Sequence, residues 1–212
     1  MGLQNRVDPS GTLWSDPARG EFMGNRGGAL HDADQRIVRA QKTRSWIICR
    51  TAFKGRRREL MQPGHYTELF FLDEVTALAA GHRPCFECRR ADANAFAEAF
   101  ARGRDRARLR APEIDACLAT ERRRRADDAD RLISLETSAA LPDGSVIRQN
   151  GTHYAVRAGK LLPWSFGGYT SPLEASALTG EPVYLVTPPA TVAALRNGYR
   201  PAFHSRAWKP GT

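Results

Sequence analysis

The stretch 79–90 reads "AAGHRPCFECRR" and places two cysteines, Cys85 and Cys88, two residues apart in an arginine-rich turn. Two thiolates from one tight turn can converge on a tetrahedral metal ion, and the proline before Cys85 stiffens that turn. A redox pair normally stands at the start of a helix, whereas this pair follows an expected helix. Two inert cysteines are the remaining interpretation. The spacing favours a metal-binding turn, and we call residues 85–88 the knuckle. Other parts of the sequence are needed to choose among the metal, redox and inert interpretations.

The composition indicates a globular protein with an anionic partner. The chain has 212 residues and a formal net charge of +9, and 28 of its 32 basic residues are arginines. Because a guanidinium pairs well with phosphate, DNA is the expected partner. A GC-rich genome would give the same excess of arginine over lysine, so charge alone leaves both explanations open. The sequence does not indicate an oligomeric state.

The N-terminus lacks the charged-then-apolar order of a signal peptide, and no apolar stretch is long enough for a membrane helix. We therefore expect a cytoplasmic protein that does not bind membranes. In that reducing compartment, the four cysteines are expected to be thiols or metal ligands rather than disulfides.

The order of the patterns predicts an α+β protein in four parts. Residues 1–19 are expected to be a loosely ordered lead-in, and residues 20–104 a metal-binding unit. A charged helical linker is expected over residues 105–140. The part from residue 141 to residue 212 is expected to be rich in strands and to end in a strand-helix-GYRP element.

Periodicity and turn residues predict the individual elements. Asp73 is expected to cap the first helix and Asp92 the second, and Asn150-Gly151 is expected to form a two-residue hairpin turn. The expected strands are 36–39, 45–53, 66–73, 145–149, 152–157 and 182–187. The expected helices are 74–80, 93–102, 112–132 and 189–197.

Two segments of the chain are similar to each other. Residues 70–84, "FFLDEVTALAAGHRP", and 184–201, "YLVTPPATVAALRNGYRP", each contain a strand, a short helix, a stop glycine and an aromatic ring before Arg-Pro. The second segment has no cysteines. A duplicated unit without the metal and a chance recurrence are both compatible with this pattern.

A longer match surrounds the cysteine pair. The segment 69–90, "LFFLDEVTALAAGHRPCFECRR", together with "WIICR" at 46–50, resembles the metal-binding domain of the Ada DNA-repair family in order and spacing. The match covers about residues 45–90. It implies a zinc site in which Cys49 is a ligand and the acceptor of a methyl group from a DNA methylphosphotriester. It also implies that Cys85 and Cys88 form the second ligand pair.

The sequence departs from the Ada pattern at one ligand position. The family has a cysteine four residues after the acceptor, and this chain has Phe53 there. We expect His31 to supply the fourth ligand, with His65 and His82 as the next candidates. Cys117 is a weaker candidate, because it stands in an expected helix and is typical of a small buried residue. Since imidazole is neutral, its replacement of a thiolate would slow alkyl transfer to Cys49.

Basic residues around the cysteines are expected to contact DNA phosphates. These residues are Arg50, Arg56, Arg57, Arg58, Arg83, Arg89 and Arg90. The arginine run 122–125 is followed at once by "ADDAD", which can neutralise it, so a solvated helix face is the preferred interpretation there.

These observations predict a zinc-binding and DNA-binding protein, and the Ada resemblance implies a link to DNA repair or to a damage response. If the chain is an enzyme, the resemblance implies stoichiometric transfer of a methyl group from DNA to Cys49. A zinc-stabilised protein-interaction module is the third hypothesis. A plain strand cysteine that faces the core remains an alternative role for Cys49.

Overall fold

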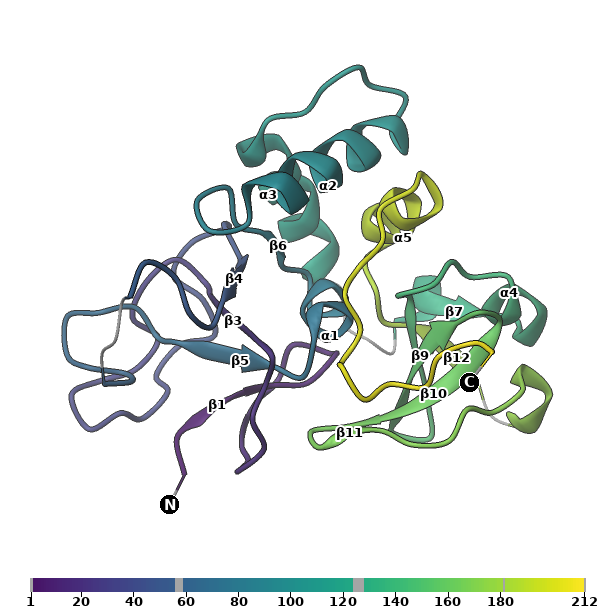
Figure 1. Cartoon of the computed structure of the whole chain (residues 1–212), viewed down its shortest axis with the longest axis horizontal. Coiled ribbons are helices and arrows are strands. Elements are labelled where there is room, and N and C mark those ends of the chain that lie inside the picture. Colours follow the sequence, from purple (N-terminus) through teal and green to yellow (C-terminus); the bar gives the residue numbers. More distant parts are fainter. Residues whose placement is uncertain (1, 56–58, 124–127, 181, 212) are drawn as a thin grey trace.

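A computed structural model of the chain describes residues 2–55, 59–123, 128–180 and 182–211. These residues form a mixed α+β fold with two six-stranded sheets at opposite ends of the molecule and helices between and above them (Figure 1). No helix in the described ranges has both the length and the apolar character needed to cross a membrane.

The first sheet has the strand order β2-β1-β5-β3-β4-β6. The pairs β1–β5 and β4–β6 are parallel, and the other neighbours are antiparallel. The strands are β1 (Gln4–Val7), β2 (Leu13–Ser15), β3 (Phe22–Asn25), β4 (Ile47–Arg50), β5 (Leu69–Phe71) and β6 (Arg83–Pro84).

The second sheet is antiparallel and has the order β11-β10-β9-β8-β12-β7. Asn150 and Gly151 both have positive φ, at 48° and 75°, as a type I′ hairpin turn between β8 and β9 requires. The predicted hairpin is therefore confirmed. The strands are β7 (Leu132–Ile133), β8 (Val146–Gln149), β9 (Thr152–Arg157), β10 (Lys160–Ser165), β11 (Gly168–Tyr169) and β12 (Val183–Leu185).

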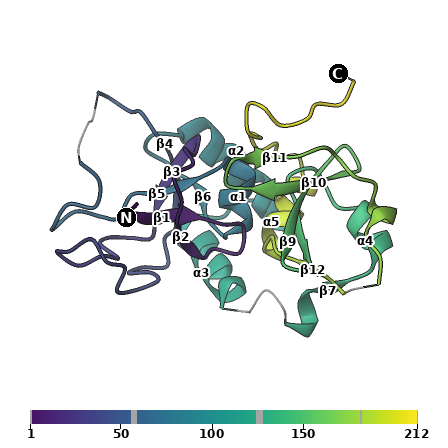
Figure 2. The same cartoon turned by 90° about the horizontal axis from the view of Figure 1, so that it is seen from below.

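The helices of the described residues lie mostly between and above the two sheets (Figure 1). They are α1 (Glu74–Ala79), α2 (Arg90–Arg102), α3 (Ala111–Arg122), α4 (Leu135–Ala139) and α5 (Pro189–Arg196), with short 3₁₀ turns η1 (Ala129–Arg131) and η2 (Ala175–Ala177). All six residues of α1 are buried, and α1 lies between the two sheets when the molecule is turned as well (Figure 2). As predicted, the Asp73 side chain caps α1 by accepting a hydrogen bond from the Thr76 N–H at 2.8 Å.

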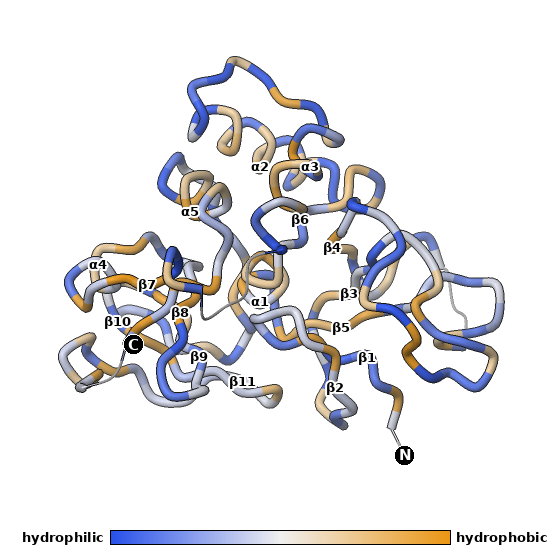
Figure 3. Tube along the Cα trace, turned by 180° about the vertical axis from the view of Figure 1, so that it is seen from behind, coloured by the Kyte–Doolittle hydropathy of each residue, from blue (hydrophilic) through white to orange (hydrophobic). Residues whose placement is uncertain are grey.

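The hydrophobic core is shared between parts of the chain that are far apart in sequence. The largest cluster joins Ile48 and Phe71 of the first sheet to Phe96 of α2 and Ala194 of α5. Hydrophobic segments follow α1, α5 and strands β3 to β5, whereas the peripheral loops are largely hydrophilic (Figure 3). Because α5 comes from the C-terminal segment and packs into this core, the expected separation into successive units does not describe the packing.

Four predicted details are wrong. The lead-in is ordered, because β1 pairs with β5 and buries Asn5 and Val7 completely. Residues 36–39 form only an isolated bridge between Ile37 and His31. Helix α2 begins at Arg90, directly after the knuckle, which places Asp92 within its first turn.

The fourth detail is the linker. Helix α3 ends at Arg122 instead of continuing to residue 132. After the segment 124–127, which lies outside the described residues, η1 leads into β7, an edge strand of the second sheet. The predicted linker therefore supplies a strand as well as helices.

The two similar sequence segments also have similar structures. In both segments the strand is the first of three successive antiparallel neighbours. These are β5, β3 and β4 in the first sheet and β12, β8 and β9 in the second. At the end of α1, the N–H groups of Gly81 and His82 donate to carbonyls three and five residues earlier. Gly198 and Tyr199 repeat both bonds at the end of α5. Each glycine has positive φ, as this type of helix end requires.

Candidate metal centre

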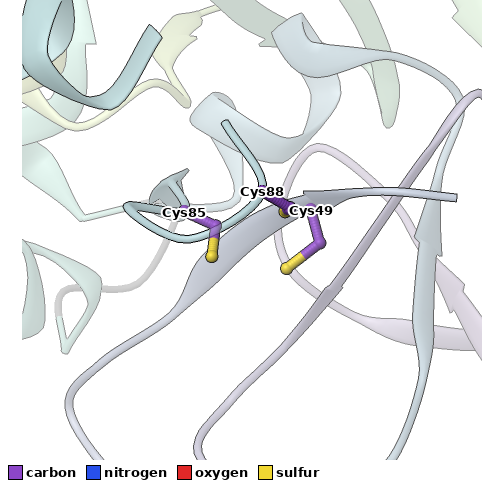
Figure 4. A group of neighbouring side chains, drawn as sticks. All are labelled: Cys49, Cys85 and Cys88. Atoms are coloured by element: carbon purple, nitrogen blue, oxygen red, sulfur yellow. The ribbon is translucent and has the colours of Figure 1, made fainter. Parts of the chain in front are cut away.

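The pairing of β4 with β6 brings the three cysteines together. The two strands are parallel, with Ile48 opposite Pro84, and the Cys85 N–H donates to the Ile48 carbonyl at 3.0 Å. Cys49 is the next residue on β4, whereas Cys85 and Cys88 lie on the turn after β6. Figure 4 shows the strand cysteine beside the two turn cysteines, which come from a distant part of the sequence.

The sulfur atoms of Cys49, Cys85 and Cys88 all lie within 4.8 Å of one another. We call these residues the cysteine cluster. Their side chains are almost completely buried, and all three are free thiols rather than disulfide partners. Three converging sulfurs at this separation are close enough to bind one metal ion, as the spacing of Cys85 and Cys88 predicts.

The backbone around the knuckle supports negative charge on sulfur. The Glu87 N–H donates to Cys85 Sγ at 3.4 Å, and the Arg50 N–H donates to the Cys88 sulfur. Helix α2 begins two residues after Cys88, so the positive end of a 13-residue helix lies next to the cluster. These dipoles favour thiolates, but burial and the neighbouring Cys85 outweigh them at Cys88 and raise its pKa.

The pKa values of Cys49 and Cys85 are shifted in opposite directions. The pKa of Cys85 is lowered to about 5, chiefly because the Cys49 thiol donates a hydrogen bond to it and also because nearby backbone N–H groups do so. The pKa of Cys49 is raised by the same hydrogen bond and by burial. Three adjacent thiolates repel one another, so their joint ionisation requires a neighbouring cation. The three sulfurs are therefore close enough, and their charges costly enough together, for a bound metal ion to hold them as thiolates.

A pocket of about 500 Å³ lies beside the cluster on the face of the first sheet. Residues of β3, β4 and β5 line it. In the strand register, Met23 of β3 lies between Cys49 of β4 and Phe70 of β5. We call it the sheet-face pocket. It is lined by Met23, Asn25, Ile47, Cys49, Arg50, Thr51, Phe53, Leu60, Tyr66, Glu68, Phe70, Glu87 and Cys88.

Glu68 is a buried acidic residue among those that line this pocket. Its side chain is 2% exposed, and its Oε2 accepts a hydrogen bond from the Met61 N–H at 2.9 Å. Its Oε1 has no hydrogen-bond partner among the residues that the structure describes. Glu68 is therefore a buried acidic residue beside the pocket with one oxygen unpaired among the described residues. The sequence analysis missed this residue, although the alternation Tyr66-Glu68-Phe70 places all three on one face of an expected strand.

The structure does not bring His31 to the cysteine cluster. The His31 ring nitrogens lie 2.6 Å from Thr67 Oγ1 and 3.3 Å from the Gln62 carbonyl oxygen, so both are engaged elsewhere. Among the described residues, no further His, Cys, Asp or Glu joins the three cysteines within the same 4.8 Å limit. Phe53, at the position of the missing cysteine, packs against the cluster.

The other ligand candidates also lie apart from the cluster. His82 is completely buried between the rings of Trp46 and Phe71, and burial lowers its pKa well below the usual value. His65 is exposed in the loop before β5. Cys117 lies on α3, with its Sγ 3.9 Å from a carboxylate oxygen of Glu121.

The arginines expected at DNA divide into two groups. Arg83 forms a buried bidentate ion pair with Asp115 at 2.8 and 2.9 Å, and Arg89 is buried against Glu74 and Asp92 at 2.9 Å each. Both arginines are committed to carboxylates, which corrects their assignment as phosphate contacts.

Arg50 and Arg90 are exposed, and Arg50 also lines the sheet-face pocket. Their contact with DNA phosphates stays a prediction. Arg56, Arg57 and Arg58 lie outside the described residues.

Comparison of the chain with protein-family models, curated proteins and solved structures finds no match in any of the three. The features of the chain that bear on its function are therefore the cysteine cluster, the sheet-face pocket and the surrounding charges.

Proposed function

We propose that the chain is a zinc-binding protein that acts on DNA, with Cys49, Cys85 and Cys88 as the protein ligands. The observation that carries the proposal is the convergence of three sulfurs from β4 and the knuckle at the edge of the sheet-face pocket. It agrees with the Ada resemblance of residues 45–90, in which the same three positions are zinc ligands.

Zinc is the metal that this donor set favours. Thiolates are soft ligands, and zinc prefers four-coordinate tetrahedral sites with sulfur and nitrogen donors. When bound, the ion would keep the three thiols deprotonated at neutral pH and leave a fourth position for an exchangeable ligand. Since Cys49 and Cys88 line the pocket, a molecule held there would lie next to the cluster.

Metal content tests the ligand assignment. Wild-type protein, purified without a His-tag, is expected to carry about one zinc per chain by elemental analysis. Cys85→Ser is expected to lose most of it, because serine removes one of three thiolates. Cys117→Ser is the matched control and is expected to retain the metal. Equal zinc in both variants would contradict the assignment.

The partner is proposed to be DNA on the basis of charge near the pocket. The chain carries a net charge of +9, and exposed Arg50 and Arg90 flank Cys49 and Cys88 along the sequence. Unlike Arg83 and Arg89, these two guanidiniums can hold backbone phosphates without breaking an ion pair within the described part of the chain. Such contacts position the nucleic acid without reading its sequence.

Salt-dependent binding to short duplexes tests this partner. Arg50→Gln and Arg90→Gln are each expected to weaken binding and to reduce the slope of log affinity against log salt by about 1, as fluorescence anisotropy would show. Arg196→Gln, an exposed position at the end of α5, is the control and is expected to leave the slope unchanged. A wild-type protein with no affinity for DNA at low salt would refute this part of the proposal.

Methyl transfer to Cys49 is a second candidate, favoured by the position of Cys49 in the pocket lining. The reaction would form a bond between Cys49 Sγ and the methyl carbon and break the bond between that carbon and the phosphotriester oxygen. The DNA would leave as a phosphodiester anion, which Arg50 is placed to stabilise. The product would be a stable thioether, so each chain would react once.

Mass spectrometry after incubation with DNA that contains methylphosphotriesters tests this candidate. The expected result is one added methyl group on the peptide that contains Cys49, with no adduct on the Cys117 peptide. Cys49→Ser should prevent the modification. An unmodified Cys49 in zinc-loaded protein that binds the same DNA would reject methyl transfer and leave the binding proposal intact.

A further inference from the structure

The sheet-face pocket is lined by aromatic rings that a ligand can reach. Phe53, Tyr66 and Phe70 line it together with Met23, and each of these side chains is half-buried, so part of each is accessible. The volume of about 500 Å³ lies within the range that is usual for small-molecule sites, which are mostly apolar with a few polar groups. The rings therefore offer a surface on which another flat ring can stack.

Hydrogen bonds hold one wall of this pocket in place. Leu60 lines the pocket, and its carbonyl accepts a hydrogen bond from Gln35 Nε2 at 3.1 Å. The next residue, Met61, is completely buried, and its N–H donates to Glu68 Oε2 at 2.9 Å. Because these bonds fix the wall against the sheet, the pocket is formed without a ligand. A preformed pocket loses little free energy in ordering when a ligand binds.

Accessible polar groups accompany the rings. Arg50 and Thr51 line the pocket and are exposed. Asn25 also lines it, and its Oδ1 accepts from the Gly27 N–H at 3.1 Å. The Nδ2 group of Asn25 donates to none of the described residues and is not buried.

These polar groups suit the remaining parts of a nucleotide. A guanidinium such as that of Arg50 pairs with a phosphate, whereas an amide and a hydroxyl can bond to the polar edge of a base. Exposed Glu87 also lines the pocket, and a carboxylate repels a phosphate but can accept a hydrogen bond from the amino group of a base. The lining therefore matches a base inside the pocket and a phosphate at Arg50.

We propose that the sheet-face pocket binds one unpaired nucleobase, stacked on its aromatic residues, while Arg50 contacts the phosphate of the same nucleotide. The base has to belong to a single strand or to leave its duplex, because a paired and stacked base cannot enter a concave pocket. This inference rests on the proposed function, since it names the part of the nucleic acid that the pocket receives. It also places the base next to Cys49 and Cys88, which line the same pocket.

Affinities for two single strands that differ in one base test the proposal. One strand consists of abasic nucleotides only, and the other has one adenine in the middle, so both carry the same phosphates. The full-length wild-type protein is expected to bind the strand with the base about tenfold more tightly, as fluorescence anisotropy would show. The reason is that stacking on aromatic side chains supplies most of the affinity for a base without reading its sequence.

Variants of Tyr66 locate the base in the pocket. Tyr66→Ala is expected to lower the ratio of the two affinities by about fivefold or more, because it removes a stacking ring. Tyr66→Phe keeps the ring and is expected to retain the ratio. Tyr184→Ala is the matched control, because it removes a half-buried ring from β12 of the second sheet, and it is expected to leave the ratio unchanged.

A second measurement needs no variant and keeps the proposal testable if Tyr66→Ala does not fold. When 2-aminopurine replaces the adenine of the single-base strand, its fluorescence is expected to fall on binding to the wild-type protein, because the base then stacks on an aromatic ring. A 2-aminopurine signal that does not change in the bound strand would contradict stacking in the pocket.

The outcomes separate this inference from the proposed function. Equal wild-type affinity for the two strands would overturn base binding and leave DNA binding through phosphates intact. A base preference that Tyr66→Ala retains in full would place the base elsewhere and would also overturn the inference. No affinity for either strand at low salt would refute both the inference and the proposed binding of DNA.

Discussion

The fold depends on two buried carboxylates at the start of α1. Asp73 accepts hydrogen bonds from the Tyr169 hydroxyl at 2.8 Å and the His204 N–H at 3.0 Å, while Glu74 accepts from the Tyr199 hydroxyl at 2.5 Å and the Ala202 N–H at 3.0 Å. Because all four donors come from the C-terminal part of the chain, α1 holds the two halves together. A buried carboxylate is costly unless its oxygens are paired, so these bonds select one arrangement of the halves.

One of these carboxylates, Glu74, also orients the cysteine cluster. Arg89 directly follows Cys88, and its guanidinium pairs with Glu74 at 2.9 Å. The knuckle is therefore fixed on one side by α1 and on the other by its hydrogen bond to β4. In the similar C-terminal segment, Ala202 and Ser205 follow Arg-Pro where the knuckle has Cys85 and Cys88. The backbone N–H groups of that segment donate hydrogen bonds to the carboxylates at the start of α1. The C-terminal segment therefore has a structural role, whereas the knuckle carries the sulfur atoms.

Local patterns predicted much of the fold and part of the site. The cap of α1, the stop at Gly81 and the turn at Asn150-Gly151 depend on neighbouring residues, so the sequence reveals them. The ion pair of Arg83 with Asp115 and the burial of β1 depend on contacts between distant segments, which no local pattern encodes. For the same reason the fourth ligand was assigned to a histidine that the folded chain holds elsewhere. Cys49 could be placed only through its resemblance to a known arrangement of cysteines.

The central claim is a zinc centre with three sulfur ligands and a fourth position open to the sheet-face pocket. X-ray absorption at the zinc edge of the zinc-loaded full-length protein tests it most directly. Coordination by Cys49, Cys85 and Cys88 with one exchangeable ligand predicts three sulfurs at about 2.3 Å and one nitrogen or oxygen at about 2.0–2.1 Å from zinc. Four sulfurs would mean that Cys117 or a cysteine of a second chain is also a ligand. Two or fewer sulfurs would mean that Cys49, Cys85 or Cys88 does not bind the ion. Either result would contradict the account.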